Sequence, residues 1–360
     1  MASSLESGNP RESKDERQAG EKAAQGAAIQ LLNQVALGYI LSSALNVALE
    51  LRIADRLADG PRSAADLAKD AGVTEDGLYR VLRALASGGI FEERQARTFV
   101  LNLPATMLKQ GPASLYDLGL WMTDPFHFRV YAEMLHSVTT GQPAAERVTG
   151  MPVFEHFARE PKLSAVFNNA MTSWSGPTVA AALEAYDFTG IRTLVDVAGG
   201  HGYVLTAVLR QYPAMRGVLF DLEHVIAGAA SIIAAAGVGD RVETASGDFF
   251  TAVPAGGDAY IMKNIIHDWD DDRSIAILRN IRTAFGDRRD GRVILLEAVI
   301  PPGNQPDFGK LIDLEMLLMP GGRERTSDEF ASLFDRAGFS LARIVPTESP
   351  LSVIEARIKP

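Results

Sequence analysis

The chain has 360 residues, of which 47% are hydrophobic and 22% are charged, with a formal net charge of −10 and no cysteine. This length suffices for two domains, and without cysteine neither a disulfide nor a thiolate metal site can form. Non-specific nucleic-acid binding depends on neutralising phosphates, so the acidic balance argues against it. The start of the chain shows no secretion signal, and we therefore expect a cytoplasmic protein.

A polar segment and an apolar helix open the chain. Residues 1–25 are too polar to bury a core, so we predict a disordered tail there. Apolar side chains cover most of the circumference of a helix over residues 27–51, which is typical of burial on several sides. Polar residues interrupt it too often for a membrane span: Gln30, Asn33, Gln34, Ser42, Ser43, Asn46 and Glu50. We expect this helix to pack against a second copy of the chain, without membrane contact.

Residues 26–112 are expected to form a small domain of winged-helix shape. Short helices over 67–71 and 77–86, with N-caps at Ser63 and Thr74, precede a wing of two strands over 91–93 and 98–101. This shape is typical of DNA-binding proteins, but it also serves in dimerisation modules. Between residues 41 and 110 nine basic residues balance nine acidic ones, so a phosphate-binding surface is not indicated. We therefore expect dimerisation and no nucleic-acid partner.

Residues 113–190 are predicted to be helical and rich in large apolar side chains, as a linker that forms the acceptor pocket. Phe167 and Met171 share a helix face, and Trp174 lies one turn further on. Such side chains can line a pocket for a flat aromatic ligand or simply pack in the core, and the pattern leaves both interpretations open.

From residue 191 to 360 strands and helices alternate. Strands are predicted over 192–197, 217–220, 242–244, 259–263, 292–298, 340–345 and 352–357. Helices are predicted over 203–211, 224–236, 271–285 and 327–337, the last with a capping box between Thr326 and Glu329. The alternation predicts a doubly wound, mostly parallel α/β sheet with a final antiparallel hairpin at its edge.

The first of these strands leads into a glycine-rich turn with Gly199, Gly200 and Gly202. Strand, glycine turn and helix form the usual cradle of a nucleoside-bearing cofactor. The dinucleotide fingerprint would place a small residue where Leu205 stands, so a nicotinamide-dependent reductase is a weaker alternative. Asp196 is a poor neighbour for a pyrophosphate but suits the ammonium and sulfonium groups of S-adenosylmethionine.

Polar residues follow each further strand of the predicted sheet, and the carboxyl ends of parallel strands meet at one edge. Asp221 and Leu222 follow the second strand, and Asp248 and Phe249 follow the third, where a carboxylate and an aromatic ring suit an adenine. The later strands end in Lys263 with His267 and in Glu297, and Glu324 precedes the last helix. These residues predict a nucleoside site beside a general base. The histidines lack metal-ligand spacing, so no metal is expected.

The segment from residue 194 onward resembles S-adenosylmethionine-dependent O-methyltransferases of the plant caffeic acid type and their bacterial natural-product relatives. The resemblance lies in the glycine loop, in Lys263 ahead of His-Asp-Trp at 267–269, and in Gly-Gly-Arg-Glu-Arg-Thr at 321–326. Residues 27–103 are similar to that family's dimerisation domain. Ala198 stands where many members have another glycine.

The resemblance implies a Rossmann-like class I methyltransferase that methylates a hydroxyl of an aromatic small molecule and dimerises through its N-terminal domain. It implies that the glycine loop holds the methionine part of the cofactor, Asp221 the ribose, Asp248 and Phe249 the adenine, and that Lys263 supports the cofactor from below. His267 would act as general base with an ordinary pKa of about 6.5, oriented by Glu297 and Glu324. Two alternatives stay open: a relative with hydroxylation or decarboxylation chemistry, and a ligand-responsive DNA-binding regulator.

Overall fold

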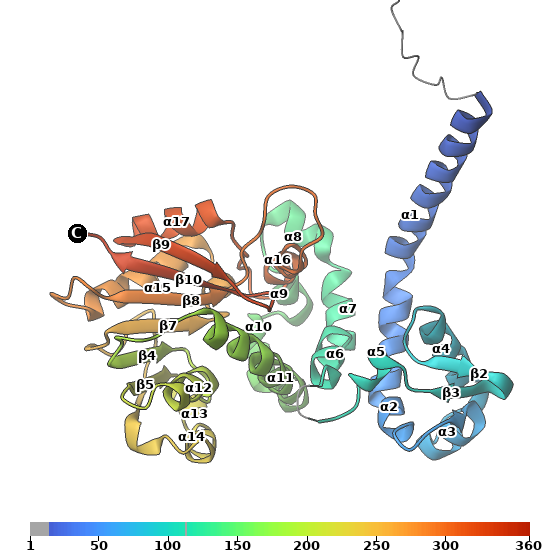
Figure 1. Ribbon diagram of the computed structural model, residues 1–360, viewed down its shortest axis with the longest axis horizontal. Coiled ribbons are helices and arrows are strands. Elements are labelled where there is room, and N and C mark those ends of the chain that lie inside the picture. Colours follow the sequence, from blue (N-terminus) through green and yellow to red (C-terminus); the bar gives the residue numbers. More distant parts are fainter. Residues whose placement is uncertain (1–13, 112–113) are drawn as a thin grey trace, which may run out of the picture. The chain divides into compact units, whose positions relative to one another are not determined.

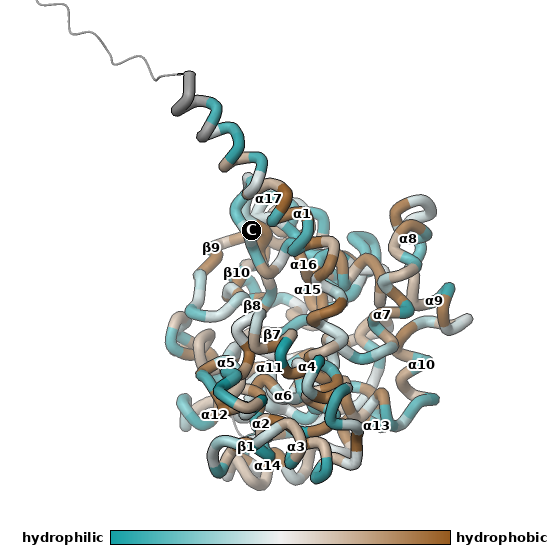
Figure 2. Tube along the Cα trace, turned by 90° about the vertical axis from the view of Figure 1, so that its right-hand side faces the viewer, coloured by the Kyte–Doolittle hydropathy of each residue, from teal (hydrophilic) through white to brown (hydrophobic). Residues whose placement is uncertain are grey.

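The computed structural model describes residues 14–111 and 114–360, in two compact units that divide between residues 109 and 110. Helix α1 (Lys14–Glu50) opens the first unit, so the disorder predicted for residues 1–25 is wrong over residues 14–25, while residues 1–13 lie outside the described part. This polar stretch is rich in Lys, Glu, Gln and Ala, which favour helix without needing a core. In the part of this stretch that Figure 2 colours, hydrophilic residues appear in teal.

Within the described chain, α1 leaves a long row of apolar side chains exposed: Ile29, Leu31, Leu32, Val35, Leu37, Tyr39, Ile40 and Leu41. By length and composition alone Gly20–Glu50 could cross a membrane, a test that a core helix of a soluble protein also passes. Apolar surface on this scale is typical of a surface that binds a partner.

The remainder of the first unit contains the helices and the wing that the sequence predicts. Its helices are α2 (Ile53–Arg56), α3 (Ala64–Ala71), α4 (Glu75–Ser87) and α5 (Leu103–Thr106). An antiparallel sheet of order β1–β3–β2 joins β1 (Arg62–Ser63), β3 (Thr98–Val100) and β2 (Glu92–Arg94), with a 3₁₀ turn (Gln95–Arg97) at the tip of the wing. Ser63 accepts the Asp66 N–H as the predicted cap, whereas Thr74 occupies the N-cap position without a side-chain bond.

The second unit begins with helices that follow one another through short loops. They are α6 (Tyr116–Met122), α7 (Pro125–Tyr131), α8 (Met134–Thr140), α9 (Ala144–Thr149), α10 (Val153–Arg159) and α11 (Pro161–Ala185). Trp121, Phe126 and Phe157 form the centre of a separate apolar cluster that also takes in Leu318 and Met319 from much later in the chain.

A seven-stranded sheet of order β6–β5–β4–β7–β8–β10–β9 forms the body of this unit (Figure 1). Its strands are β4 (Thr193–Val197), β5 (Arg216–Asp221), β6 (Val242–Ser246), β7 (Ala259–Lys263), β8 (Arg292–Glu297), β9 (Phe339–Pro346) and β10 (Ser352–Ile358). The first five in this order are parallel, and β10 runs antiparallel to both β8 and β9. The predicted parallel sheet and its edge hairpin are confirmed.

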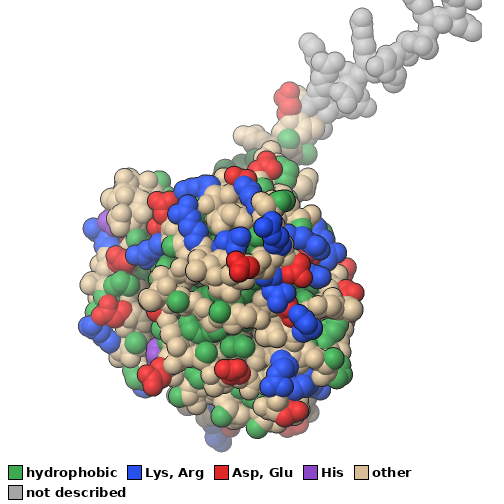
Figure 3. All heavy atoms as spheres, turned by 90° about the vertical axis from the view of Figure 1, so that its left-hand side faces the viewer, with side chains coloured by type: hydrophobic (Ala, Val, Ile, Leu, Met, Phe, Trp, Pro, Cys, Tyr) green, Lys and Arg blue, Asp and Glu red, His purple; other side chains and the backbone are tan. Residues whose placement is uncertain are grey.

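Helices cover both faces of the sheet because successive strand residues point to opposite sides. Leu194 joins the apolar cluster of α12 (Tyr203–Gln211), and Val195 joins that of α15 (Asp271–Ala284). The other helices are α13 (Glu223–Ile226), α14 (Ala230–Ala236), α16 (Phe308–Leu318) and α17 (Ser327–Arg336), with 3₁₀ turns η2 (Gly239–Arg241) and η3 (Ile266–Asp268). On the face that Figure 3 shows, charged side chains of both signs stand among apolar ones.

Two helical predictions differ from the structure. The helix predicted over 224–236 is two helices, α13 and α14, with a break around Gly228. A Cβ on Gly228 would lie 2.6 Å from Nε2 of His201, so the chain bends here in close contact with the glycine loop. Helix α16 was not predicted, and it carries residues that line the cavity described below.

Candidate active site

The glycine loop between β4 and α12 has backbone angles and close contacts that favour glycine over residues with a Cβ. A Cβ on Gly199 would lie 2.5 Å from Cγ of Asp196 and 2.6 Å from Cδ1 of Leu219. Gly200 and Gly202 have φ values of 59° and 86°, in the left-handed region that favours glycine. The loop is therefore held close to its own strand, and the space beside Gly200 is open within 4 Å.

Asp221 ties the end of β5 to this loop. Its Oδ2 accepts the Gly200 N–H at 2.8 Å, and its Oδ1 accepts the N–H of Leu222 at 2.7 Å. The structure thus brings the predicted residues at the ends of the first two strands together. Leu222 itself is 47% exposed at the start of α13.

Asp196 lies under the loop, where sequence analysis expected a carboxylate facing the cofactor's positive end. It is 1% exposed, and its Oδ2 accepts the N–H of Leu205 at 3.2 Å. Burial raises the pKa of Asp196 to about 7, although the hydrogen bond from Leu205 opposes this. Asp196 therefore supports the loop and the start of α12 from inside the sheet.

Asp248, Phe249 and Lys263 lie at the ends of the next strands. Asp248 is exposed and caps its own turn by accepting the Phe250 N–H at 2.8 Å. Phe249 packs edge-on against Phe250, with ring centroids 4.8 Å apart. Burial lowers the pKa of the Lys263 ammonium, against the opposing charges of Glu297 and Asp196. An exposed carboxylate beside an aromatic ring suits the amino group and face of an adenine.

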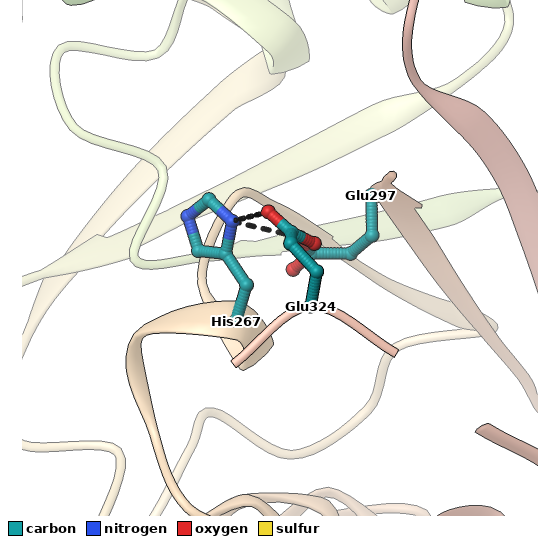
Figure 4. A group of neighbouring side chains, drawn as sticks. All are labelled: His267, Glu297 and Glu324. Carbon is teal, nitrogen blue, oxygen red and sulfur yellow. Dashed lines mark hydrogen bonds and ion pairs between the residues drawn. The ribbon is translucent and has the colours of Figure 1, made fainter. Parts of the chain in front are cut away.

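His267, Glu297 and Glu324 form a buried hydrogen-bonded group (Figure 4). Nδ1 of His267 lies 2.7 Å from Oε1 of Glu324 and 3.5 Å from Oε2 of Glu297. Glu297 is anchored in turn, because its Oε1 accepts the N–H groups of Ile265 and Ile266 at 3.0 and 2.9 Å. The second ring nitrogen, Nε2, points away from both glutamates. The three predicted catalytic residues thus come together from η3, β8 and the loop before α17.

The charges around His267 change its expected acid–base behaviour. Burial by itself lowers the pKa of the imidazole, but the charges of Glu297 and Glu324 outweigh it and raise the pKa to about 10. The ordinary pKa of about 6.5 expected from the sequence is therefore wrong. Burial also raises the pKa of Glu297 to about 7, against the opposing charge of His267. Below this pKa the ring is protonated on both nitrogens, and the negative charges of Glu297 and Glu324 favour that form.

Two contacts hold the segments of this group in place. Arg325, 1% exposed, donates from its guanidinium to the backbone oxygens of Ile266 and Trp269 and to the carboxylate of Asp271. Gly322 is buried so closely that a Cβ there would overlap the backbone oxygen of His267. The loop that carries Glu324 and the turn that carries His267 therefore meet backbone to backbone.

A cavity in the second unit opens beside His267. It encloses about 990 Å³ of space, part of it continuous with solvent, and most of the residues around it are apolar or aromatic. Phe167, Met171 and Trp174, which the sequence left open between pocket and core, all line it. Trp174 stacks on Phe308 of α16, with ring centroids 5.3 Å apart. A cavity with this lining suits a flat aromatic molecule.

Sequence reasoning missed three polar residues of this cavity, Asn264, Asp268 and Glu315, and Oδ1 of Asp268 lies 3.6 Å from Nε2 of His267. Asn264 has a φ of 53°, which is unusual for a residue with a side chain, and its buried Oδ1 has no partner among the described residues. Glu315 is flanked by Leu314 and Met316 on α16, two residues after Asp313. A carboxylate between apolar neighbours was the available signal.

His267, Glu297 and Glu324 are also residue types that bind divalent cations. Each offers one ligand atom, and the three atoms lie within 4.8 Å of one another. The 2.7 Å separation of Nδ1 and the Glu324 oxygen is that of a hydrogen bond. A hydrogen on Nδ1 leaves that atom no lone pair for a metal. The geometry therefore favours an ion pair.

Comparisons with known proteins cover both units. A model of the O-methyltransferase domain matches residues 131–340, and a model of the O-methyltransferase dimerisation domain matches residues 33–111. A phenazine O-methyltransferase of Lysobacter antibioticus is 43% identical over 328 residues, which are 91% of this chain and 95% of that protein.

Two solved structures extend the similarity to three dimensions. The mitomycin 7-O-methyltransferase MmcR superposes with a TM-score of 0.86 at 34% identity, covering 94% of this chain and 100% of its own. NcsB1, an O-methyltransferase from neocarzinostatin biosynthesis solved with S-adenosylmethionine and 2-hydroxy-5-methyl naphthoic acid, superposes with a TM-score of 0.75 at 31% identity. That match covers 88% of this chain and 96% of NcsB1.

Proposed function

The chain belongs to the S-adenosylmethionine-dependent O-methyltransferases, and from that premise we propose that His267 removes the proton of a phenolic hydroxyl on an aromatic acceptor. The observation that carries the proposal is the orientation of the imidazole. Glu324 holds the hydrogen on Nδ1, so Nε2 is the nitrogen that exchanges a proton with a molecule in the cavity.

The raised pKa of His267 supports a phenolic acceptor. The raised pKa makes the neutral imidazole, which forms as the pH rises, a stronger base than an ordinary histidine, so it accepts a proton from a phenol, whose own pKa is about 10, at less cost. An aliphatic hydroxyl is far less acidic and would not give up its proton to this base. Glu297 and Glu324 hold the ring in place and stabilise the charge that it gains.

The loop and strand ends fit the cofactor of the family. S-adenosylmethionine supplies, when bound, an electrophilic methyl group on a positively charged sulfur. We assign Gly199, Gly200 and Gly202 to its methionine part, Asp221 and Leu222 to the ribose, and Asp248 and Phe249 to the adenine, with Asp196 and Lys263 as support beneath. The open space beside Gly200 and the Cβ overlap at Gly199 support close approach of a ligand to this backbone.

The aromatic acceptor is placed in the cavity against Phe167, Met171 and Trp174. Their rings and thioether offer apolar contact to a flat molecule while His267 meets its hydroxyl. The names of two related enzymes refer to phenazine and to mitomycin biosynthesis. We propose an acceptor of comparable aromatic, natural-product character for this chain.

The exposed apolar row of α1 belongs to the segment that the dimerisation model matches from residue 33 onward. We propose that two copies bury this row in a homodimer, which accounts for it without a membrane. The cytoplasmic location stays a prediction.

The function is tested with the His267→Ala variant. Wild-type protein, labelled S-adenosylmethionine and a panel of phenols are incubated, and mass spectrometry locates the transferred methyl group. We expect methylated phenol from the wild type and at least about 100-fold less from the variant, with unchanged affinity for S-adenosylhomocysteine by calorimetry. His136→Ala, on α8, is the matched control. Turnover by His267→Ala at the wild-type rate would refute the base, and cofactor binding without any methyl transfer by the wild type would favour a non-methylating relative.

A further inference from the structure

A second group of buried polar side chains, separate from the one around His267, reaches the cavity at Glu315. Glu315 lies on α16, lines the cavity and is 5% exposed. Its Oε1 lies 2.9 Å from Nε2 of His127 on α7, a residue 188 positions away in the chain. Its Oε2 accepts the hydroxyl hydrogen of Tyr131 at 2.5 Å. The proton transfer proposed for His267 uses none of these three side chains.

The hydrogen bonds indicate that His127 is neutral. It is 3% exposed, and its buried Nδ1 has no hydrogen-bond partner among the residues that the structure describes. A protonated ring would carry a hydrogen on both nitrogens, and a buried N–H without an acceptor is costly. The tautomer with its hydrogen on Nε2 leaves a lone pair at Nδ1 and donates to Glu315. Trp121 packs edge-on against this ring, with centroids 4.4 Å apart, which fixes its orientation.

Glu315 is correspondingly an ionised carboxylate whose charge no cation offsets within the group. Both of its oxygens accept a hydrogen bond, one from His127 and one from Tyr131. Burial, with the charge of Glu315 next, raises the pKa of Tyr131, so the phenol remains a donor. A carboxylate has about four lone-pair positions, of which these two bonds use half.

The largely apolar wall of the cavity strengthens the effect of this charge on a bound ligand. Apolar and aromatic side chains dominate the lining, and its other ionisable side chains, His267, Asp268 and Glu324, form a separate group of their own. A carboxylate at such a wall strongly favours a ligand that donates a hydrogen bond to it. The same wall penalises a ligand that brings a second negative charge.

We propose that Glu315 determines acceptor specificity by binding a hydrogen-bond donor on the acceptor, a second hydroxyl or an N–H group, and by rejecting acceptors that carry a carboxylate. His127 and Tyr131 are positioning residues that hold the carboxylate. This inference rests on the proposed function, because it takes the cavity to be the site of an aromatic acceptor.

Isothermal titration calorimetry with saturating S-adenosylhomocysteine tests the proposal on three kinds of probe. They are 1-naphthol, naphthalenediols with the second hydroxyl at position 5, 6 or 7, and the hydroxynaphthoic acids substituted at the same positions. We expect at least one diol to bind about tenfold or more tightly than 1-naphthol, and the acids to bind about tenfold or more weakly. Equal affinities across the panel would overturn the proposal.

The variant Glu315→Gln keeps the size of the side chain and removes its charge. In this variant the preference for the diols and the discrimination against the acids should each fall to about threefold or less. In Glu315→Asp the diols should still bind more tightly than 1-naphthol, and the acids more weakly. Glu184→Gln, exposed on α11, is the matched control and should behave as wild type. Preferences that persist unchanged in Glu315→Gln would refute the role of Glu315, and the wild-type panel tests it even if that variant fails to fold.

Methyl transfer to the same probes separates the two proposals. If the wild type methylates naphthols but the panel binds with equal affinity, the role of Glu315 is wrong and the function stands. If the wild type methylates none of the probes while the diols still bind preferentially, the specificity stands and the function is wrong. For diols that are methylated, the loss in Glu315→Gln should appear in KM more than in kcat.

Discussion

His267 combines two properties that a sequence cannot reveal together: a hydrogen-bonded orientation and a raised pKa. The residue type and its position after the fourth strand were predictable, because the carboxyl ends of parallel strands form the site of such sheets. The pKa depends on distances of 2.7 and 3.5 Å to carboxylates that lie far away in the chain. Those distances are set by tertiary packing, so the sequence alone led to an ordinary value.

The pH dependence of methyl transfer should follow this raised pKa. The neutral imidazole is the base, so kcat/KM should rise with pH up to about 10. Glu297→Gln removes a negative charge that stabilises the imidazolium; the pKa of His267 falls, and the rising limb should move to lower pH. A pH–rate profile of both proteins measures this. The acceptor's own ionisation cannot cause the shift, and a limb that stays in place would contradict the charge effect.

Adding a single methyl group at Gly199 tests whether the glycine loop binds the cofactor. In Gly199→Ala the added Cβ would press on Asp196 and Leu219 beneath the loop, so the loop must move. We expect affinity for S-adenosylhomocysteine to fall about tenfold or more in calorimetry. Gly237→Ala is the matched control: φ there is 68°, with no heavy atom within 4 Å of the new Cβ. It should cost about 1 kcal/mol of stability and leave cofactor affinity unchanged.

At the scale of helices and strands, local sequence patterns predicted the strands of the large sheet well. They predicted the helices of the second unit less well. All seven strands of the large sheet appear where alternating and apolar runs placed them. The break between α13 and α14 lies at Gly228, where an added Cβ would overlap His201, and no local pattern reveals that contact. Helix α16 was missed although Asp307 caps it by accepting the Lys310 N–H, and the partners of Glu315 on it come from α7.

Arg325 connects three elements, and its removal should show in stability as well as in activity. Its guanidinium bonds two backbone oxygens of the η3 region and Asp271 at the start of α15. Arg325→Ala leaves those buried oxygens without donors, so we expect a loss of about 3 kcal/mol in the free energy of unfolding. Arg323→Ala, whose side chain is 47% exposed in its ion pair with Glu329, should cost about 1 kcal/mol or less. Urea unfolding of both variants compares them, and equal losses would contradict the bridging role of Arg325.

At the scale of the whole molecule, the apolar row of α1 should control assembly. Val35 is 73% exposed and Leu32 is 68% exposed within one chain. A charge at either position, as in Val35→Asp, would be desolvated in a dimer, so we expect sedimentation to show monomers. Gln18→Glu, on the polar start of α1, is the control and should remain dimeric. A dimeric Val35→Asp protein would place the interface elsewhere.

Gly322 has a consequence for how such an enzyme can change its acceptors. The two segments that carry His267 and Glu324 touch through their backbones at this residue, so even one added methyl group would separate the base from its partner. The helices α6, α10 and α11 supply much of the cavity wall but none of that group. Libraries that randomise those helices while keeping residues 264–271 and 320–326 constant should therefore yield variants with new acceptor scope and intact chemistry. Reactivity and acceptor choice can evolve separately in this chain.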